Sequence, residues 1–275
     1  MPVPEKEKQV AERGNIRAPR RLVLSTVSVV VGVGIWLTLT SAAKVIPPAF
    51  LPPPQNIVTD FFRILQTSYV GHTLVGHTLV SLQIVLGGFF MAVAIGIPLG
   101  ILMGWFKRIE AIVDPLFQLL RPIPPLAWIP LSLLWFGIGV KSKIFVIWLS
   151  AFVPCVINSY TGVRLTEPLL VKAALGLGVQ RHRDLLREVA IPSALPLILG
   201  GVRIGLGAAW MTLVAAELLA SDAGLGYMMQ MARRALEPSV IILGMLVIGI
   251  LGALMARGLR VLEKRICPWV KEEGH

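Results

Sequence analysis

TLVSLQIVLGGFFMAVAIGIPLGILMGWF, residues 78–106, is a run of 29 residues without a charged side chain. A helix needs about 20 mainly apolar residues to cross the hydrocarbon core of a bilayer. Inside that core only structures that satisfy all their own backbone hydrogen bonds are stable, which favours the helix. The stretch therefore predicts a membrane-spanning helix and sets the fold class of the chain.

The composition of the whole chain supports this interpretation. Of the 275 residues, 55% are hydrophobic and only 15% are charged, and the mean hydropathy is +0.76. A soluble domain normally carries about 25% charged residues. The deficit is too large for a water-exposed surface, so a soluble globular protein is excluded.

Five further runs on either side of residues 78–106 are apolar enough to cross a membrane. The first, which ends at Ala43, is longer than the apolar part of a signal peptide, and no small-residue cleavage motif follows it. We therefore interpret it as a retained anchor. The sequence predicts an all-α integral membrane protein with six transmembrane helices. The five runs cover residues 22–43, 122–140, 144–163, 191–220 and 238–256.

The basic residues predict the orientation of these spans. With residues 1–21 and 263–275 as cytoplasmic tails, 18 Lys and Arg lie on the cytoplasmic side and six on the other side. Cytoplasmic loops of membrane proteins accumulate Lys and Arg, so this asymmetry fits an N-terminus and a C-terminus inside the cell. The net charge of +11 is distributed over these loops, which argues against nucleic-acid binding.

An extracytoplasmic segment, residues 44–76, separates the first two spans. Its first part, IPPAFLPPPQNIV, contains five prolines, which disfavour a helix and favour extended geometry. From Ile57 to Leu65 the apolar residues recur on one helical face. We expect this part to form an amphipathic helix on the membrane surface.

The most informative cytoplasmic segment is the loop 166–191, in the stretch TEPLLVKAALGLGVQRHRDLLREVAIP. Its first half has apolar residues on one helical face, and Gly176 and Gly178 then end or turn the helix. A short basic helix, residues 181–188, follows before Pro192 opens the next span. The predicted order is helix, glycine turn, helix.

Two patterns in this loop resemble the EAA loop of ABC importer permeases. They are K-A-A-x-x-x-G, beginning at Lys172, and V-A-I-P, ending at Pro192. In that family the loop forms a coupling helix that docks into a groove of the ATPase subunit. The residues that this resemblance assigns to ATPase coupling are Lys172, Ala173, Ala174, Gly178, Arg181, Arg183, Leu185 and Pro192.

The loop departs from the family pattern at two places. Lys172 stands where the family usually has Glu. The 13 residues between Gly178 and Pro192 are one more than usual. Within a continuous helix one extra residue rotates the subsequent residues by about 100°, so we expect the turn at residues 179–182 to absorb it.

Four more motifs are similar to the nitrate, sulfonate and taurine permease family, most of all to taurine permeases. They are FLPPPQNIV (50–58), RPIPPLAWIPLSLLWFGIG (121–139), GVRIGLGAAWMTLVAAELLA (201–220) and GLGYMMQ (224–230).

This resemblance implies a MetI-like type I importer permease domain over residues 77–262, in a bacterial plasma membrane. The implied partners are a dimeric ATPase subunit that binds ATP and Mg, an extracytoplasmic substrate-binding protein, a second permease copy and membrane lipid. The implied substrate is a small anion such as taurine, another sulfonate or nitrate.

Two charges lie inside the predicted fifth span. Arg203 and Glu217 are 14 residues or about 21 Å apart, so they cannot pair within one helix. Intramembrane charges usually face a protein interior or a cavity. Arg203 is a candidate anion guide, or else its side chain extends to the inner headgroups; Glu217 is a candidate outer gate or binding-protein contact, or else lies at the outer interface. Trp210 and Thr212 are candidate substrate contacts, although packing alone also explains a membrane tryptophan.

Arg121 and the prolines at positions 122, 124 and 125 stand at the entry of the predicted third span. Proline leaves backbone carbonyls without their helical partner, and broken helices often line cavities. We expect a broken helix that borders a cavity.

Other function classes lack their motifs. No Gly-Lys dipeptide exists, so the chain has no phosphate-binding loop and ATP has to be bound by a partner. Two cysteines and four histidines show no metal-ligand spacing, so no cofactor or metal is expected. A secondary transporter or channel that acts alone is the alternative. It predicts ionisable residues in the middle of the membrane and often inverted repeats.

Overall fold

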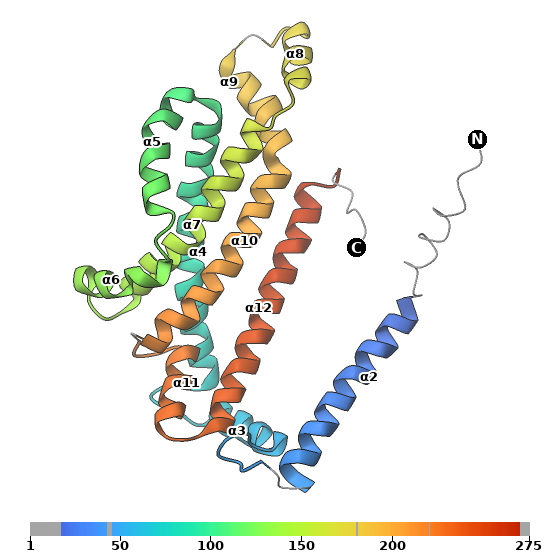
Figure 1. Ribbon diagram of the computed structural model, residues 1–275, viewed down its shortest axis with the longest axis vertical. Coiled ribbons are helices and arrows are strands. Elements are labelled where there is room, and N and C mark those ends of the chain that lie inside the picture. Colours follow the sequence, from blue (N-terminus) through green and yellow to red (C-terminus); the bar gives the residue numbers. More distant parts are fainter. Residues whose placement is uncertain (1–17, 43–45, 180, 220, 270–275) are drawn as a thin grey trace.

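The computed structural model describes residues 18–42, 46–179, 181–219 and 221–269. Most of the predicted N-terminal tail, residues 1–17, and the last part of the C-terminal tail, residues 270–275, lie outside the described residues. The chain forms an elongated helical bundle with short helices at both ends (Figure 1).

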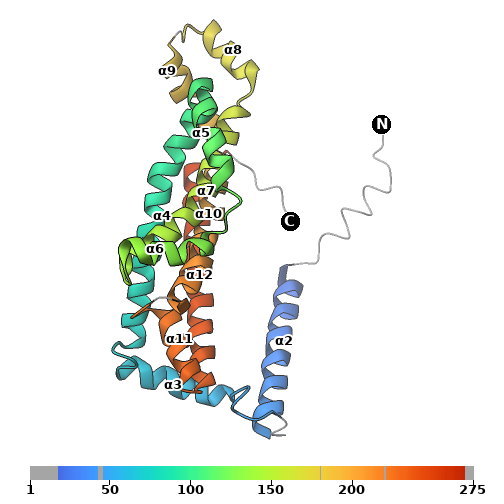
Figure 2. The same ribbon diagram turned by 60° about the vertical axis from the view of Figure 1, so that its left-hand side comes forward.

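Three long helices form the core of the bundle. They are α4 (Leu74–Trp105), α7 (Val140–Arg164) and α10 (Ile191–Leu219), which lie side by side in both views (Figures 1 and 2). Glycines let α4 and α7 approach closely, because a Cβ at Gly88 would lie 2.6 Å from Ile147 Cγ2 and one at Gly100 would lie 2.4 Å from the Val156 carbonyl oxygen. Small residues at such contacts stabilise membrane helix pairs through close packing.

Helix α12 (Pro238–Ile266) packs along α10 with one face and leaves most of its surface exposed (Figure 1). Helix α2 (Ala18–Leu37) continues into a π-helical turn, Thr38–Ala42, and stands apart from the bundle in both views (Figures 1 and 2). The C-terminal end of α2 is held by Trp36 Nε1, which donates a hydrogen bond to the Pro52 carbonyl oxygen at 3.2 Å.

The predicted number of six spans is not reproduced. Within the described ranges, four helices are long and apolar enough to cross a membrane: α4, α7, α12 and the continuous helical stretch His182–Leu219. A fifth crossing results if one bent helix pair counts as a single span. The predicted first anchor contains a shorter apolar helix, Thr26–Ser41.

The predicted third span, residues 122–140, is wrong as a continuous helix. The chain instead forms α5 (Lys107–Leu120), a 3-10 turn (η2, Pro125–Trp128) and the short helix α6 (Ile129–Phe136), with a bend of 84° between the two parts. Proline cannot donate a helical hydrogen bond, which explains the break after Leu120. The prolines predicted this break in the helix. The sequence did not predict α5, because charged residues near its start interrupt the uncharged run.

One end of the bundle is closed by α3 (Pro54–Gln66) and α11 (Leu225–Arg234). The predicted amphipathic helix forms as α3, with Ile57 and Ile64 buried against α11 and α12 and its other face exposed. Its position on the membrane surface stays a prediction. Tyr69 lies next to this cluster, where burial and the nearby Glu237 carboxylate raise its pKa to about 12.

The opposite end carries the loop between α7 and α10. It contains α8 (Pro168–Gly176), α9 (His182–Leu185) and a π-helical turn (η3, Leu186–Ala190). In Figures 1 and 2 this loop projects beyond the end of α12. The predicted order of helix, glycine turn and helix is confirmed.

Candidate functional site

The loop between α7 and α10 is built around Gly178. Gly178 has a φ of +94°, a conformation that strongly favours glycine. The Val179 N–H donates to the Ala174 carbonyl at 3.1 Å, and the Gly178 N–H donates to the Leu175 carbonyl at 3.1 Å. This pair of bonds is the Schellman motif that ends many helices. Gly178 therefore ends α8 and reverses the chain toward α9.

The side chains of this loop fall into two groups. Ala174 of α8 and Leu185 of α9 are buried. Leu177 is 87% exposed, and Leu169 is also exposed. The remaining predicted coupling residues at the surface are Lys172, Ala173, Gly178, Arg181, Arg183 and Pro192. The loop thus presents apolar and basic side chains together on an open surface.

The predicted basic helix is joined to α10. It begins at His182 and passes through the π turn Leu186–Ala190 directly into α10 at Ile191, with Pro192 in its first turn. A π turn holds more residues than an α-helical turn. The turn therefore offers a second place, besides residues 179–182, for the additional residue of this loop; Gln180 lies outside the described residues.

Arg203 is paired with a residue of another helix. Its Nε donates to Glu263 Oε1 of α12 at 3.1 Å, and its Nη2 contacts Glu263 Oε2. The uncharged part of α12, Pro238–Ala256, is about 28 Å long, close to the thickness of the hydrocarbon core. Arg203 therefore lies level with the charged end of α12, near the interface.

The other predicted path residues of α10 face two different neighbours. Trp210 packs against α12, where a Cβ at Gly252 would lie 2.8 Å from Trp210 Nε1. Thr212 is buried, and its Oγ1 donates to Ser150 Oγ of α7 at 2.8 Å. The structure therefore does not bring Arg203, Trp210, Thr212 and Glu217 together in one site.

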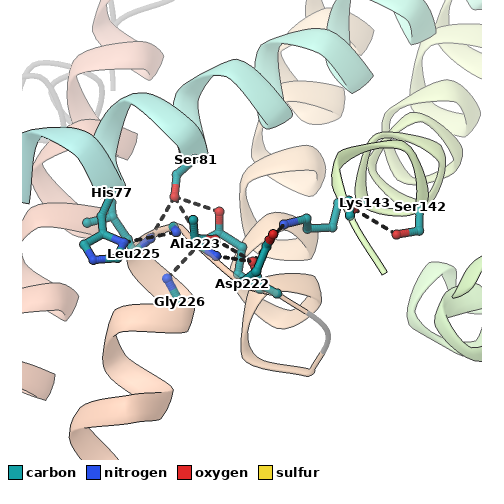
Figure 3. A network of polar contacts seen from close by, with 12 residues as sticks. His77, Ser81, Ser142, Lys143, Asp222, Ala223, Leu225 and Gly226 are labelled. Atoms are coloured by element: carbon teal, nitrogen blue, oxygen red, sulfur yellow. Dashed lines mark hydrogen bonds and ion pairs between the residues drawn. The ribbon is translucent and has the colours of Figure 1, made fainter. Parts of the chain in front are cut away.

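Glu217 is 1% exposed and accepts hydrogen bonds in a polar network of which Figure 3 labels Ser81, Leu225 and Gly226. Ser81 Oγ of α4 donates to its two carboxylate oxygens at 2.7 and 3.0 Å, and the Gly226 N–H donates to Oε2 at 2.8 Å. Ser81 Oγ also accepts a hydrogen bond from the Leu225 N–H at 2.9 Å. Glu217 thus joins α10 to α4 and to the beginning of α11.

His77 extends this network on α4. Its Nδ1 accepts a hydrogen bond from the Gly224 N–H at 3.2 Å, and its Nε2 lies 2.9 Å from the Tyr69 carbonyl oxygen. A ring that accepts at Nδ1 and donates at Nε2 is a neutral imidazole with its proton on Nε2. His77 therefore fixes the turn before α11 and holds no metal with these partners.

A second anchor comes from α7. The Lys143 side chain is 2% exposed, and its Nζ donates to Ser221 Oγ at 2.8 Å and lies 3.5 Å from Asp222 Oδ1 (Figure 3). Burying an ammonium group is costly unless it is paired and hydrogen-bonded. The turn between α10 and α11 is thus attached to α4 on one side and to α7 on the other.

The broken third span borders a cavity of about 550 Å³, as expected. Six of its fifteen lining residues are aromatic side chains from α5, η2, α6 and α7, and Arg121 and Ser150 are among its polar residues. Ser150 connects the cavity to Thr212 behind it. The lining aromatic residues are Phe117, Trp128, Trp135, Phe145, Trp148 and Phe152.

Sequence reasoning missed the partners of the charged residues. Ser81 lies 136 residues before Glu217, and a serine in an apolar run gives no signal of such a contact. Glu263 was assigned to the cytoplasmic tail, although α12 extends to Ile266. Glu263 lies among basic residues near the end of α12, and this position could have identified it as a partner for a basic side chain.

The described ranges contain no group of three or more His, Cys, Asp or Glu side chains that could hold a metal ion. Their polar groups are instead used to join helices and to shape the two ends of the bundle.

Residues 96–268 of the chain match the family model described as binding-protein-dependent transport system inner membrane component. The taurine transport system permease protein of Escherichia coli is 41% identical over 251 residues, which are 91% of this chain and 90% of that protein. A Methanocaldococcus jannaschii protein named as an ABC transporter permease is 42% identical over 92% of this chain and 94% of its own length.

Relatives at 32–36% identity carry the names of aliphatic sulfonate, bicarbonate and nitrate transport permeases. Among solved structures, an inward-facing MetNI methionine ABC transporter matches with a TM-score of 0.53 and 19% identity, over 68% of this chain and 95% of that chain. This likeness supports the MetI-like fold. The chain belongs to the family of inner membrane components of binding-protein-dependent transport systems, the ABC importer permeases.

Proposed function

We propose that this chain is the translocation subunit of an ATP-driven importer for taurine or another small sulfonate. The observation that carries the proposal is the loop around Gly178, an exposed helix-turn-helix whose second helix is continuous with a membrane-spanning helix. The similarity to taurine and sulfonate permeases supports the substrate class.

The loop is the proposed docking site of a separate ATPase subunit, present as a dimer, which binds ATP and Mg. Leu177 offers an apolar anchor, and Arg181 and Arg183 offer charges at the rim. Buried apolar anchors with a polar rim are typical of protein interfaces. Because α9 continues into α10, a movement of the ATPase reaches the membrane core directly.

The proposed translocation path follows the cavity of the broken third span. Two permease copies would face each other across it, with an extracytoplasmic binding protein delivering the substrate. Thr212 fits this role through Ser150, and Arg121 supplies a positive charge for an anion. In this arrangement Arg203 lies near the cytoplasmic exit, where its ion pair with Glu263 partly neutralises its charge. For Trp210 and Glu217 a packing role accounts better for their contacts.

The proposed coupling loop is tested by Gly178→Val. A β-branched residue at a positive φ is strained, and the left-handed conformation alone costs about 1–2 kcal/mol. We expect loss of substrate uptake and of substrate-stimulated ATP hydrolysis in the assembled importer, with normal membrane insertion.

Gly249→Val on α12, where an added Cβ meets no atom within 4 Å, is the matched control and should retain uptake. Reversing the charges of Arg181 and Arg183 to Glu should also uncouple ATP hydrolysis from transport. Wild-type transport in the Gly178 and the arginine variants would contradict the coupling role of the loop.

The substrate is tested by deleting the gene and measuring growth on taurine, alkanesulfonates or nitrate as the limiting nutrient. We expect loss of growth on taurine or a sulfonate and rescue by the intact gene. A defect confined to nitrate would favour the nitrate branch of the family. Uptake by the chain alone in liposomes, without an ATPase, would favour a secondary transporter.

A further inference from the structure

A groove between α10 and α12 lies outside the coupling loop and shares only Arg203 with the proposed path. It has a volume of about 210 Å³ and lies at the charged end of α12. Each helix contributes residues spaced by three and four positions, which is one helical face. The lining residues are Pro196, Leu199, Gly200 and Arg203 from α10 and Arg260, Glu263, Lys264 and Cys267 from the end of α12.

Basic side chains outnumber acidic ones among the described residues that line this groove. Arg203, Arg260 and Lys264 are basic, and Glu263, which pairs with Arg203, is acidic. Arg260 and Lys264 are exposed and lie one helical turn apart. The guanidinium and ammonium groups together fit a phosphate, which Arg recognises through paired hydrogen bonds.

A second groove of about 220 Å³ adjoins the first one, and Arg203 borders both. Apart from Arg203 its lining is almost entirely apolar and includes Met255 and Leu259 of α12. An added Cβ at Gly200 or Gly207 would meet no atom within 4 Å, so these glycines leave the groove open. The contact between Trp210 and Gly252 brings the helices together at the apolar end.

The two grooves form one channel on the bundle surface with a basic end and an apolar end. The basic end lies beyond the uncharged part of α12, at the depth where phospholipid phosphates reside. The apolar end extends toward the middle of the membrane. A soluble anion would use only the basic half, whereas a phospholipid fills both halves.

We propose that the channel between α10 and α12 is a binding site for an anionic phospholipid, with the phosphate at Arg260 and Lys264 and an acyl chain along Met255 and Leu259. Basic pockets between membrane helices on the cytoplasmic side bind anionic lipid headgroups in this way. Placing the lipid in the cytoplasmic leaflet rests on the proposed orientation; the binding itself rests on the grooves alone.

The test is native mass spectrometry of the full-length, delipidated protein titrated with phosphatidylglycerol or with phosphatidylcholine of the same acyl chains. We expect tighter binding of phosphatidylglycerol. The double variant Arg260→Gln, Lys264→Gln should weaken that binding by roughly tenfold or more, because each basic residue near an anionic headgroup contributes about 1 kcal/mol.

The matched control is Arg233→Gln, Arg234→Gln, which removes two basic residues from α11 at the other end of the bundle and should leave the preference unchanged. Gly207→Leu fills the apolar half of the channel. It should weaken the binding of long-chain phosphatidylglycerol more than the binding of a short-chain form. Inorganic phosphate should bind no better than chloride.

Three results would overturn the lipid site. They are an unchanged preference for phosphatidylglycerol in the Arg260 and Lys264 variant, an equal loss in the control variant, and phosphate binding as tight as that of the lipid. The last result would identify a site for a free anion. None of these results bears on the coupling loop, whose test measures transport.

Discussion

Glu217 makes contacts that differ from those predicted for a charged side chain in this span. It was expected at an outer gate, at a binding-protein contact or at the outer interface, but it accepts hydrogen bonds from Ser81 and Gly226 in the interior of the bundle. Gly224 and Gly226 have no room for a side chain, because an added Cβ would lie 2.2 Å and 2.7 Å from Glu217 atoms. The carboxylate and the two glycines therefore act as one unit.

Glu217→Ala removes the acceptor of this unit. The Ser81 hydroxyl and the Gly226 N–H would lose their partner, and an unsatisfied buried polar group costs about 1–3 kcal/mol. We expect a clearly lower melting temperature of the purified protein in detergent, and a smaller decrease for Glu217→Gln, which keeps one oxygen.

Glu188→Ala, at an exposed position of the π turn, is the control and should melt like the wild type. If Glu217→Ala melted at the same temperature as this control, the network would have no role in stability.

At the residue scale the sequence identified unusual groups but not their partners. A charge in an apolar run stands out by itself, which is why Arg203 and Glu217 were noticed. Their partners lie 60 and 136 residues away in the chain, and only the packing of the helices brings them together. A single sequence therefore does not show which residues of different helices pair with each other.

At the scale of the elements, hydropathy predicted α4, α7, α10 and α12 because each contains a long apolar run, which in α10 is interrupted only by Arg203 and Glu217. It failed for α5, which starts with Lys107 and Arg108 and carries Glu110. These charges have partners or face the exposed surface: Glu110 accepts hydrogen bonds from Tyr160 at 2.6 Å and from Arg164 at 2.7 Å. An amphipathic helix at a bundle surface does not form an uncharged run, so this criterion misses it.

The contact between α4 and α7 gives a second prediction. An alanine at Gly100 would place its Cβ 2.4 Å from the Val156 carbonyl oxygen, a backbone atom that cannot rotate away. Forcing a methyl group into such a contact costs about 1–3 kcal/mol. We expect Gly100→Ala to lower the melting temperature of the protein in detergent.

Gly249→Ala adds the same methyl group to α12, where it meets no atom within 4 Å. It should be neutral or slightly stabilising, since alanine favours a helix over glycine by roughly 0.5–1 kcal/mol. Equal melting temperatures for the two variants would mean that α4 and α7 are not closely packed.

On the scale of the whole molecule, the two ends of the bundle are predicted to lie on opposite sides of the membrane. Leu177 in the coupling loop and Leu236 between α11 and α12 are 87% and 85% exposed. Both native cysteines, Cys155 and Cys267, are buried, so they give little background in a labelling experiment.

The expected result is that a membrane-impermeant maleimide labels Leu236→Cys from outside the inner membrane and Leu177→Cys only after the membrane is permeabilised. The distribution of basic residues supports this orientation. Labelling of Leu177→Cys on intact membranes would place the loop outside and remove it from any ATPase.

The unbroken run of helix from His182 to Leu219 has one more consequence. Its 38 residues form a rod of about 57 Å with the proposed coupling loop at one tip and the Glu217 network at the other. In the proposed coupling, this rod carries a displacement of the loop to the other end of the bundle. The five residues of the π turn lie near the loop, so such a displacement passes through them before it reaches the membrane-spanning part of the rod.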